Sequence, residues 1–135
     1  MKTVQTPQGL QIPIVFSALN LIRRSGLAQD ALIVQKLLRE GRILISSGLG
    51  ETTRGLTAPQ EEGKNRKIYL DSRLFDPKAP FLSALRTAAT LVHELAHWKN
   101  ARDWSRLQPL EVAETPARKA ENDFFHKLSN RSPRI

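Results

Sequence analysis

Apolar residues recur at intervals of three and four along four stretches of the chain, which is the spacing of one face of an α-helix. The stretches run from residue 14 to 24, from 27 to 40, from 80 to 100–102, and from 109 to 128. Gly41 directly follows the second stretch, at a position where glycine commonly ends a helix. We therefore expect four helices, with the first two forming a hairpin that packs behind the third.

Two shorter stretches have the composition of β-strands. Residues 42–46 are rich in branched side chains, and within residues 67–71 Ile68 and Leu70 alternate onto one face. The long polar segment 47–67 between them is either a flap over a binding site or an excursion such as a hairpin. Together these patterns predict an α+β fold, mostly helical, with a short antiparallel sheet beside the third helix.

The chain has 135 residues, which is enough for one domain with a hydrophobic core. We expect a single domain over residues 1–135, in which 1–41 form a helical scaffold, 42–71 form the sheet and long loop, and 80–130 form the two helices that carry the chemistry. The absence of cysteine excludes a disulfide framework and a thiolate metal site. Any metal must therefore be bound by His, Asp or Glu.

The formal net charge is +8, from 21 Lys and Arg against 13 Asp and Glu, and it favours anionic partners. The basic residues are scattered and do not form a recognised nucleic-acid-binding motif. An aromatic content of 6% also argues against a stacking platform for single strands. Nucleic acid therefore stays open as a partner but is not favoured.

No apolar run approaches the ~20 residues needed to span a bilayer, so we expect no membrane span. Polar residues and a proline interrupt the apolar block near the N-terminus, and Arg23-Arg24 stands where a signal peptide needs a small-residue cleavage site. We therefore expect no signal peptide. This leaves a cytoplasmic protein or one exported by a dedicated secretion system, and the compartment stays open.

Two of the three histidines of the chain lie in the run His93-Glu94-Leu95-Ala96-His97, inside the third predicted helix. Residues four apart lie on the same face of a helix, so His93 and His97 can direct two imidazoles at one cation. Two imidazoles suit Zn²⁺, and a carboxylate next to a metal-bound water suits proton abstraction. The spacing predicts a zinc site with Glu94 as the general base.

This run resembles the active-site helix of the zincin metallopeptidases. The extension typical of metzincins is absent after His97, and the resemblance is to the gluzincin type, in which a downstream Glu is the third ligand. It covers the second half of the chain, and the small size and the run 68–71 are similar to compact bacterial effector and toxin metallopeptidase domains. The resemblance implies a zinc-dependent peptidase acting on protein or peptide substrates, with an immunity or inhibitor protein as the partner of a toxin.

The third ligand is expected from the fourth predicted helix, which can run back past the third. The run Glu114-Thr115-Pro116-Ala117 is similar to the E-x-x-A pattern that carries the ligand Glu in gluzincin-type proteins, and this implies Glu114. Pro116 departs from the usual pattern, because a proline inside a helix removes a hydrogen bond and puts the register in doubt. Glu111 and Glu121 therefore stay open as alternatives.

Tyr69 and His126 are the candidates for stabilising the oxyanion of a peptidase transition state. The alternative for Tyr69 is a packed strand residue, and for His126 an exposed helix residue. In zincins an edge strand near the metal receives the substrate backbone as an added strand, and the strand over 67–71 is the candidate for that role here.

Three functions are compatible with these observations. The favoured one is a metallopeptidase, as an effector or toxin, that hydrolyses peptide bonds through a zinc-bound water activated by Glu94. The second is a zinc amidase or peptidase that acts on peptidoglycan peptides. The third is a basic, nucleic-acid-associated module in which the metal site is structural or vestigial.

Overall fold

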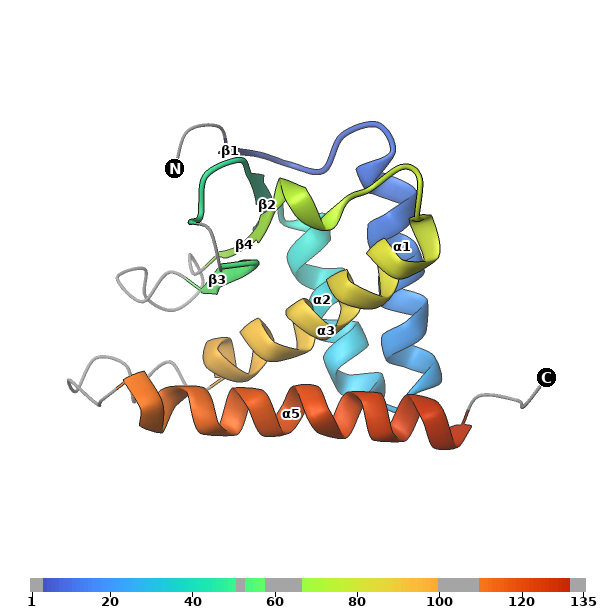
Figure 1. The fold of residues 1–135 in the computed structure, drawn as a ribbon, viewed down its shortest axis with the longest axis vertical. Coiled ribbons are helices and arrows are strands. Elements are labelled where there is room, and N and C mark those ends of the chain that lie inside the picture. The colour runs from blue at the N-terminus through green and yellow to red at the C-terminus, as the bar shows by residue number, and fades with distance from the viewer. Residues whose placement is uncertain (1–3, 51–52, 58–66, 100–109, 132–135) are drawn as a thin grey trace.

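The structure, a computed structural model, describes residues 4–50, 53–57, 67–99 and 110–131 (Figure 1). Within these ranges the side chains of 99, 110–115 and 131 are outside the description. The α+β class predicted from the sequence is confirmed: most of the described residues lie in helices, and a small sheet lies at one side.

All four predicted helices are present in the described part of the chain. They are α1 (Gln11–Arg24), α2 (Ala28–Arg39), α3 (Pro80–Lys99) and α5 (Leu110–Arg131). The predicted end of the third helix at 100–102 lies outside the described residues. Pro116 lies inside α5 and does not start it, so the helix begins before the proline. No helix in the described part of the chain combines the length and apolar character that a membrane span requires.

Glycines end the first two helices, as the sequence predicts for Gly41. Gly26 and Gly41 have φ angles of +90° and +68°, in the left-handed region that glycine adopts without a steric penalty. The amide of the residue after each glycine donates back into the helix, to the carbonyls of Ile22 at 3.3 Å and Leu37 at 2.9 Å. These bonds satisfy carbonyls in the last turn and reverse the chain sharply.

The sheet has four strands in the order β1-β2-β4-β3. Their bounds are β1 (Val4–Gln5), β2 (Ile43–Ser46), β3 (Gly55–Thr57) and β4 (Ile68–Asp71). The predictions for β2 and β4 are confirmed, whereas β1 and β3 are too short to leave a sequence signal.

The pairing directions correct the prediction of an antiparallel sheet. β1 with β2 and β3 with β4 are antiparallel, but β2 and β4 run parallel, with Ile43 opposite Ile68 and Ser46 opposite Asp71. A parallel pair needs a long crossover, and the segment between β2 and β4 supplies one. Part of that segment returns as β3, so the described part of it contributes a strand to the sheet edge.

α3 is the central element of the molecule: it packs against α1, α5 and the sheet (Figure 1). Its buried residues Leu91, Val92 and Leu95 belong to one hydrophobic core with side chains from the neighbouring elements. Those neighbours include Leu19, Ile22, Ile68, Leu70 and Phe124. Burial on several sides fixes the rotation of α3 about its axis, and with it the direction of its polar residues.

Candidate functional site

The polar residues of α3 gather in one stripe that borders a cleft. Arg86, Thr90, His93 and His97 follow one another at steps of four, three and four residues, and all four line the same cleft. The ring centroids of His93 and His97 are 5.2 Å apart, with an angle of 63° between the ring planes. The sequence expectation that these two imidazoles share one helix face is met.

α5 places a carboxylate beside the first of these histidines. Glu121 Oε1 lies 3.1 Å from His93 Nδ1, and Ala117 and Phe124 of the same helix are fully buried and set its rotation. A carboxylate oxygen accepts hydrogen bonds, so Nδ1 is the donor in this contact. Glu121 therefore holds His93 in an orientation in which Nε2 is the atom able to bind a metal.

β3 covers Glu94 from the side of the sheet. The Thr57 hydroxyl lies 3.0 Å from Glu94 Oε1 and 2.9 Å from the Glu94 carbonyl oxygen, and it donates its one hydrogen to either. Thr57 is buried, and Glu94 is only 6% exposed. The carboxylate of Glu94 is thus held from a strand that is 37 residues distant in sequence.

Gly55 allows this close approach of β3 to α3. A Cβ atom at position 55 would lie 2.6 Å from Thr90 Cγ2 and 2.9 Å from Glu94 Cγ, closer than real Cβ contacts. The glycine is therefore needed for space, because any side chain would push the strand off the helix or displace Glu94.

The cleft has a volume of about 1120 Å³ and lies between β3, α3 and α5. Among the described residues, its charged lining consists of Glu94 and Glu121 together with three arginines, Arg54, Arg86 and Arg118. A second cavity, of about 540 Å³, lies between α1 and the start of α3, where Leu10 and Phe81 are part of a largely apolar wall. The described residues of its lining include no histidine or carboxylate, so the candidate catalytic residues line the first cleft.

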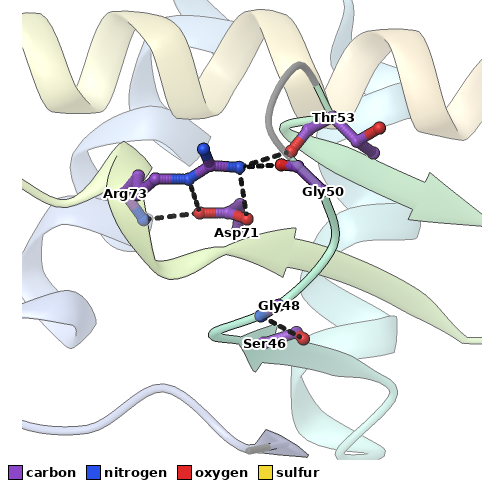
Figure 2. A network of polar contacts seen from close by, with 6 residues as sticks. All are labelled: Ser46, Gly48, Gly50, Thr53, Asp71 and Arg73. Carbon is purple, nitrogen blue, oxygen red and sulfur yellow. Dashed lines mark hydrogen bonds and ion pairs between the residues drawn. The ribbon is translucent and has the colours of Figure 1, made fainter. Parts of the chain in front are cut away.

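A network of polar contacts holds the chain that leads into β3 (Figure 2). The Asp71 carboxylate, at the end of β4, accepts hydrogen bonds from Arg73 Nε at 2.8 Å, Arg73 Nη2 at 3.0 Å and the Arg73 amide at 2.8 Å. The same guanidinium donates to the carbonyls of Gly50 and Thr53. β4 is thereby tied to the segment that delivers Gly55 and Thr57 to α3.

The Asp71 carboxyl is charged in this setting. Its burial raises the pKa, but the hydrogen bonds from the side chain and amide of Arg73, the charge of Arg73 and the amide of Leu49 outweigh burial. The pKa of Asp71 therefore lies below its ordinary value of 3.8. The ion pair between the buried Asp71 carboxylate and the partly exposed Arg73 guanidinium is therefore fully formed at neutral pH.

The donors in the cleft are of the types that zinc prefers, namely two imidazoles with carboxylates nearby. Among the side chains that the structure describes, no three His, Asp or Glu groups converge as a complete metal site. The predicted third ligand, Glu114, and the alternative Glu111 lie in α5, but their side chains are outside the described residues. The described residues thus include two histidines that could bind a metal and a carboxylate bonded to one of them.

The structure does not bring the two oxyanion candidates to the cleft. Tyr69 is buried in β4 and alternates with Ile68 and Leu70, which face the core and α3, so its side chain lies on the opposite face of the sheet. His126 is exposed on α5, and neither residue lines the cleft. β4 is also interior to the sheet, so the edge strand beside the site is β3 and not the predicted strand over 67–71.

Several residues of the site could not be identified from the sequence. Gly55 and Thr57 stand in a polar segment without a motif, and the three arginines are dispersed over the chain. For Arg86 a signal does exist, because it precedes His93 by seven residues and so shares its helix face. The other residues can be assigned to the site only from the packing of β3 and α5 on α3.

No family model matches the chain, and neither a curated protein nor a solved structure matches it.

Proposed function

We propose that this protein is a zinc-dependent metallopeptidase that hydrolyses peptide bonds in the cleft between β3, α3 and α5. The observation that carries the proposal is the position of Glu94. It is almost buried, is held by the Thr57 hydroxyl, and follows His93 directly on the helix whose two histidines line the cleft. A fixed carboxylate beside two imidazoles suits metal-assisted hydrolysis.

The metal would be held by His93 and His97 of α3 and by a glutamate of α5, for which Glu114 is the expectation. When bound, zinc supplies a Lewis acid that acidifies water and polarises a carbonyl group. Glu121 keeps the His93 ring in position through Nδ1, as carboxylates commonly do for metal-binding histidines.

Glu94 performs the proton transfers in this proposal. Its carboxylate accepts a proton from the attacking water as the water adds to the scissile carbonyl carbon. It then gives the proton to the amide nitrogen as the carbon–nitrogen bond breaks, and the leaving amine departs neutral. Thr57 limits the rotation of the Glu94 side chain, so that the base is already oriented when substrate binds.

The edge of the sheet offers a binding place for the substrate backbone. β3 is the last strand in the order of the described sheet, and its residues Gly55, Leu56 and Thr57 line the cleft. A peptide that pairs with this edge in an extended conformation would bind next to the strand whose Thr57 contacts Glu94. This use of β3 supports a polypeptide substrate.

Metal analysis combined with one substitution tests the proposal. Purified protein should contain one zinc per chain and cleave unfolded proteins, whereas Glu94→Gln should keep the metal and lose at least about 100-fold in kcat. Peptidoglycan peptides assayed in parallel distinguish a cell-wall amidase from a protease. Full activity in Glu94→Gln, or activity that survives complete removal of zinc, would contradict the proposed mechanism.

A further inference from the structure

Arginines from three separate elements surround the residues proposed for catalysis. Arg54 lies directly before β3, Arg86 on α3, and Arg118 on α5, and all three are exposed and line the cleft. The two carboxylates in the same lining, Glu94 and Glu121, are bonded to Thr57 and His93. The charged side chains in the described part of the lining are thus three arginines and two glutamates, an excess of one cation.

The positions of the arginines indicate which parts of a bound substrate each could contact. Arg86 precedes His93 by seven residues, which is about 10.5 Å along the helix axis. An extended peptide advances about 3.3 Å per residue, so a peptide that runs along α3 would place a side chain about three residues from the scissile bond beside Arg86. Arg118 precedes Glu121 by one turn, and Arg54 adjoins Gly55, so these two border the catalytic residues more closely.

We propose that the cleft selects polypeptide segments with aspartate or glutamate within about three residues of the scissile bond, and that Arg54, Arg86 and Arg118 recognise those carboxylates. The inference rests on the proposed peptidase function and names its substrate class. A guanidinium carries five N–H donors and can bind a substrate carboxylate while keeping another contact. Attraction between the cleft and an acidic segment also raises the rate of association.

A polypeptide fits the cleft better than a nucleic acid does. One wall is the edge of β3, whose backbone can pair with an extended chain. Apart from the two histidines, Phe125 is the only aromatic residue in the described lining, whereas single-stranded nucleic acids usually bind on several aromatic side chains. Preferential binding of a nucleic acid in the cleft would therefore overturn the proposal.

Matched peptide libraries provide the kinetic test. One quenched fluorescent library contains Asp and Glu, and the second has Asn and Gln in their place. We expect kcat/KM to be about tenfold higher for the acidic library, through KM, and the difference to shrink between about 50 and 500 mM salt. Arg86→Gln and Arg118→Gln should each reduce this preference severalfold, whereas Arg39→Gln, an exposed arginine at the end of α2, should leave it unchanged.

A binding measurement separates failure of the inference from failure of the proposed function. Glu94→Gln protein is titrated against a fluorescein-labelled acidic peptide and its amide analogue, with anisotropy as the readout. Tighter binding of the acidic peptide, lost in Arg86→Gln, supports the inference even if no peptide is cleaved. Equal binding of both peptides, equal cleavage of both libraries, or stronger competition by a single-stranded oligonucleotide than by the acidic peptide overturns it.

Discussion

At the scale of single residues, the central feature is the hydrogen bond between Thr57 and Glu94. Thr57 Oγ1 can donate to Glu94 Oε1 at 3.0 Å or to the Glu94 carbonyl at 2.9 Å, and both atoms are buried. The bond holds the proposed base and does not involve the proposed metal ligands. Removing the hydroxyl should therefore affect proton transfer and leave metal binding intact.

Thr57→Val keeps the branched shape but removes the donor. We expect kcat to fall about tenfold, which corresponds to the ~1.4 kcal/mol of a well-formed hydrogen bond to a charged group. Zinc content and KM should stay close to those of the wild type. Thr57→Ser, which keeps the hydroxyl, is the matched control and should retain most of the activity; an equal loss of kcat in both variants would show that the hydroxyl is not responsible.

The glutamates of α5 have different expected roles, and their substitution separates them. Glu114→Gln should remove the third ligand and abolish stable zinc binding, whereas Glu121→Gln should weaken zinc affinity only about 10- to 100-fold, because Glu121 orients His93 without binding the metal. Glu111→Gln is the control and should leave affinity unchanged. Competition with a chromogenic chelator measures all three, and loss of zinc in Glu111→Gln alone would move the third ligand to that residue.

At the scale of elements, the position of β3 depends on the Asp71–Arg73 pair. β3 has only three residues and pairs with β4 alone among the described strands. A strand this short gains little from its ladder, so the bonds from Arg73 to Gly50 and Thr53 contribute substantially to its placement (Figure 2). The pair thus acts on Glu94 indirectly, through the strand that carries Thr57.

Asp71→Asn should destabilise the fold by about 2 kcal/mol at pH 7, because it removes the charge of a buried group that accepts three hydrogen bonds from Arg73 and puts an NH2 donor in place of one acceptor oxygen. The pKa of Asp71 is lowered in the folded state, so the stabilisation is complete above its ordinary value of 3.8 and is lost as pH falls through the lower folded value. The difference between wild type and variant in urea unfolding should therefore be constant from pH 7 to about 5 and shrink below about 4.

The exposed pair of Lys119 and Asp123, 3.0 Å apart on α5, provides the comparison. Asp123→Asn should cost at most about 0.5 kcal/mol at pH 7, as exposed pairs one helical turn apart usually do. If the difference in stability between wild type and Asp71→Asn stays the same down to pH 3, the charge of the Asp71 carboxylate is not what stabilises the segment from Gly50 to Thr53.

At the scale of the whole molecule, the cleft exists because α5 docks across α3. Phe124 is fully buried in the common core, and Ala117, also fully buried, allows the two helices to approach closely. The docking brings Glu121 to His93 and places Arg118 in the cleft. Stability and site geometry therefore depend on the same helix interface.

Phe124→Ala should lower the free energy of unfolding by about 3–5 kcal/mol, since it removes a buried aromatic side chain and leaves a cavity. Thermal and urea unfolding measure the loss, and zinc affinity should fall as well because α5 is less firmly placed. Leu32→Ala, at an exposed position of α2, should change stability by less than about 0.5 kcal/mol. Unchanged stability in Phe124→Ala would mean that α5 does not depend on this contact.

Local periodicity in the sequence is sufficient to predict the helices, two of the strands and the shared helix face of His93 and His97. In each case the residues that matter lie within one or two turns, or alternate along one strand, so their geometry follows from helix and strand repeats. Gly41 is a further example, because its left-handed conformation depends only on its place after a helix. These features require no knowledge of distant contacts.

The pairing of the strands and the surroundings of Glu94 could not be predicted in this way, because they depend on how the chain packs in three dimensions. Whether β2 and β4 run parallel is decided by the path of the intervening segment, and contacts such as Thr57 to Glu94 or Glu121 to His93 join residues 37 and 28 positions apart. The local sequence around a side chain does not indicate such a partner, because the two residues are brought together only when whole helices and strands pack against one another. The residue types of the proposed catalytic site can therefore be identified from the sequence, whereas their orientation and the arginine-lined cleft arise from tertiary packing.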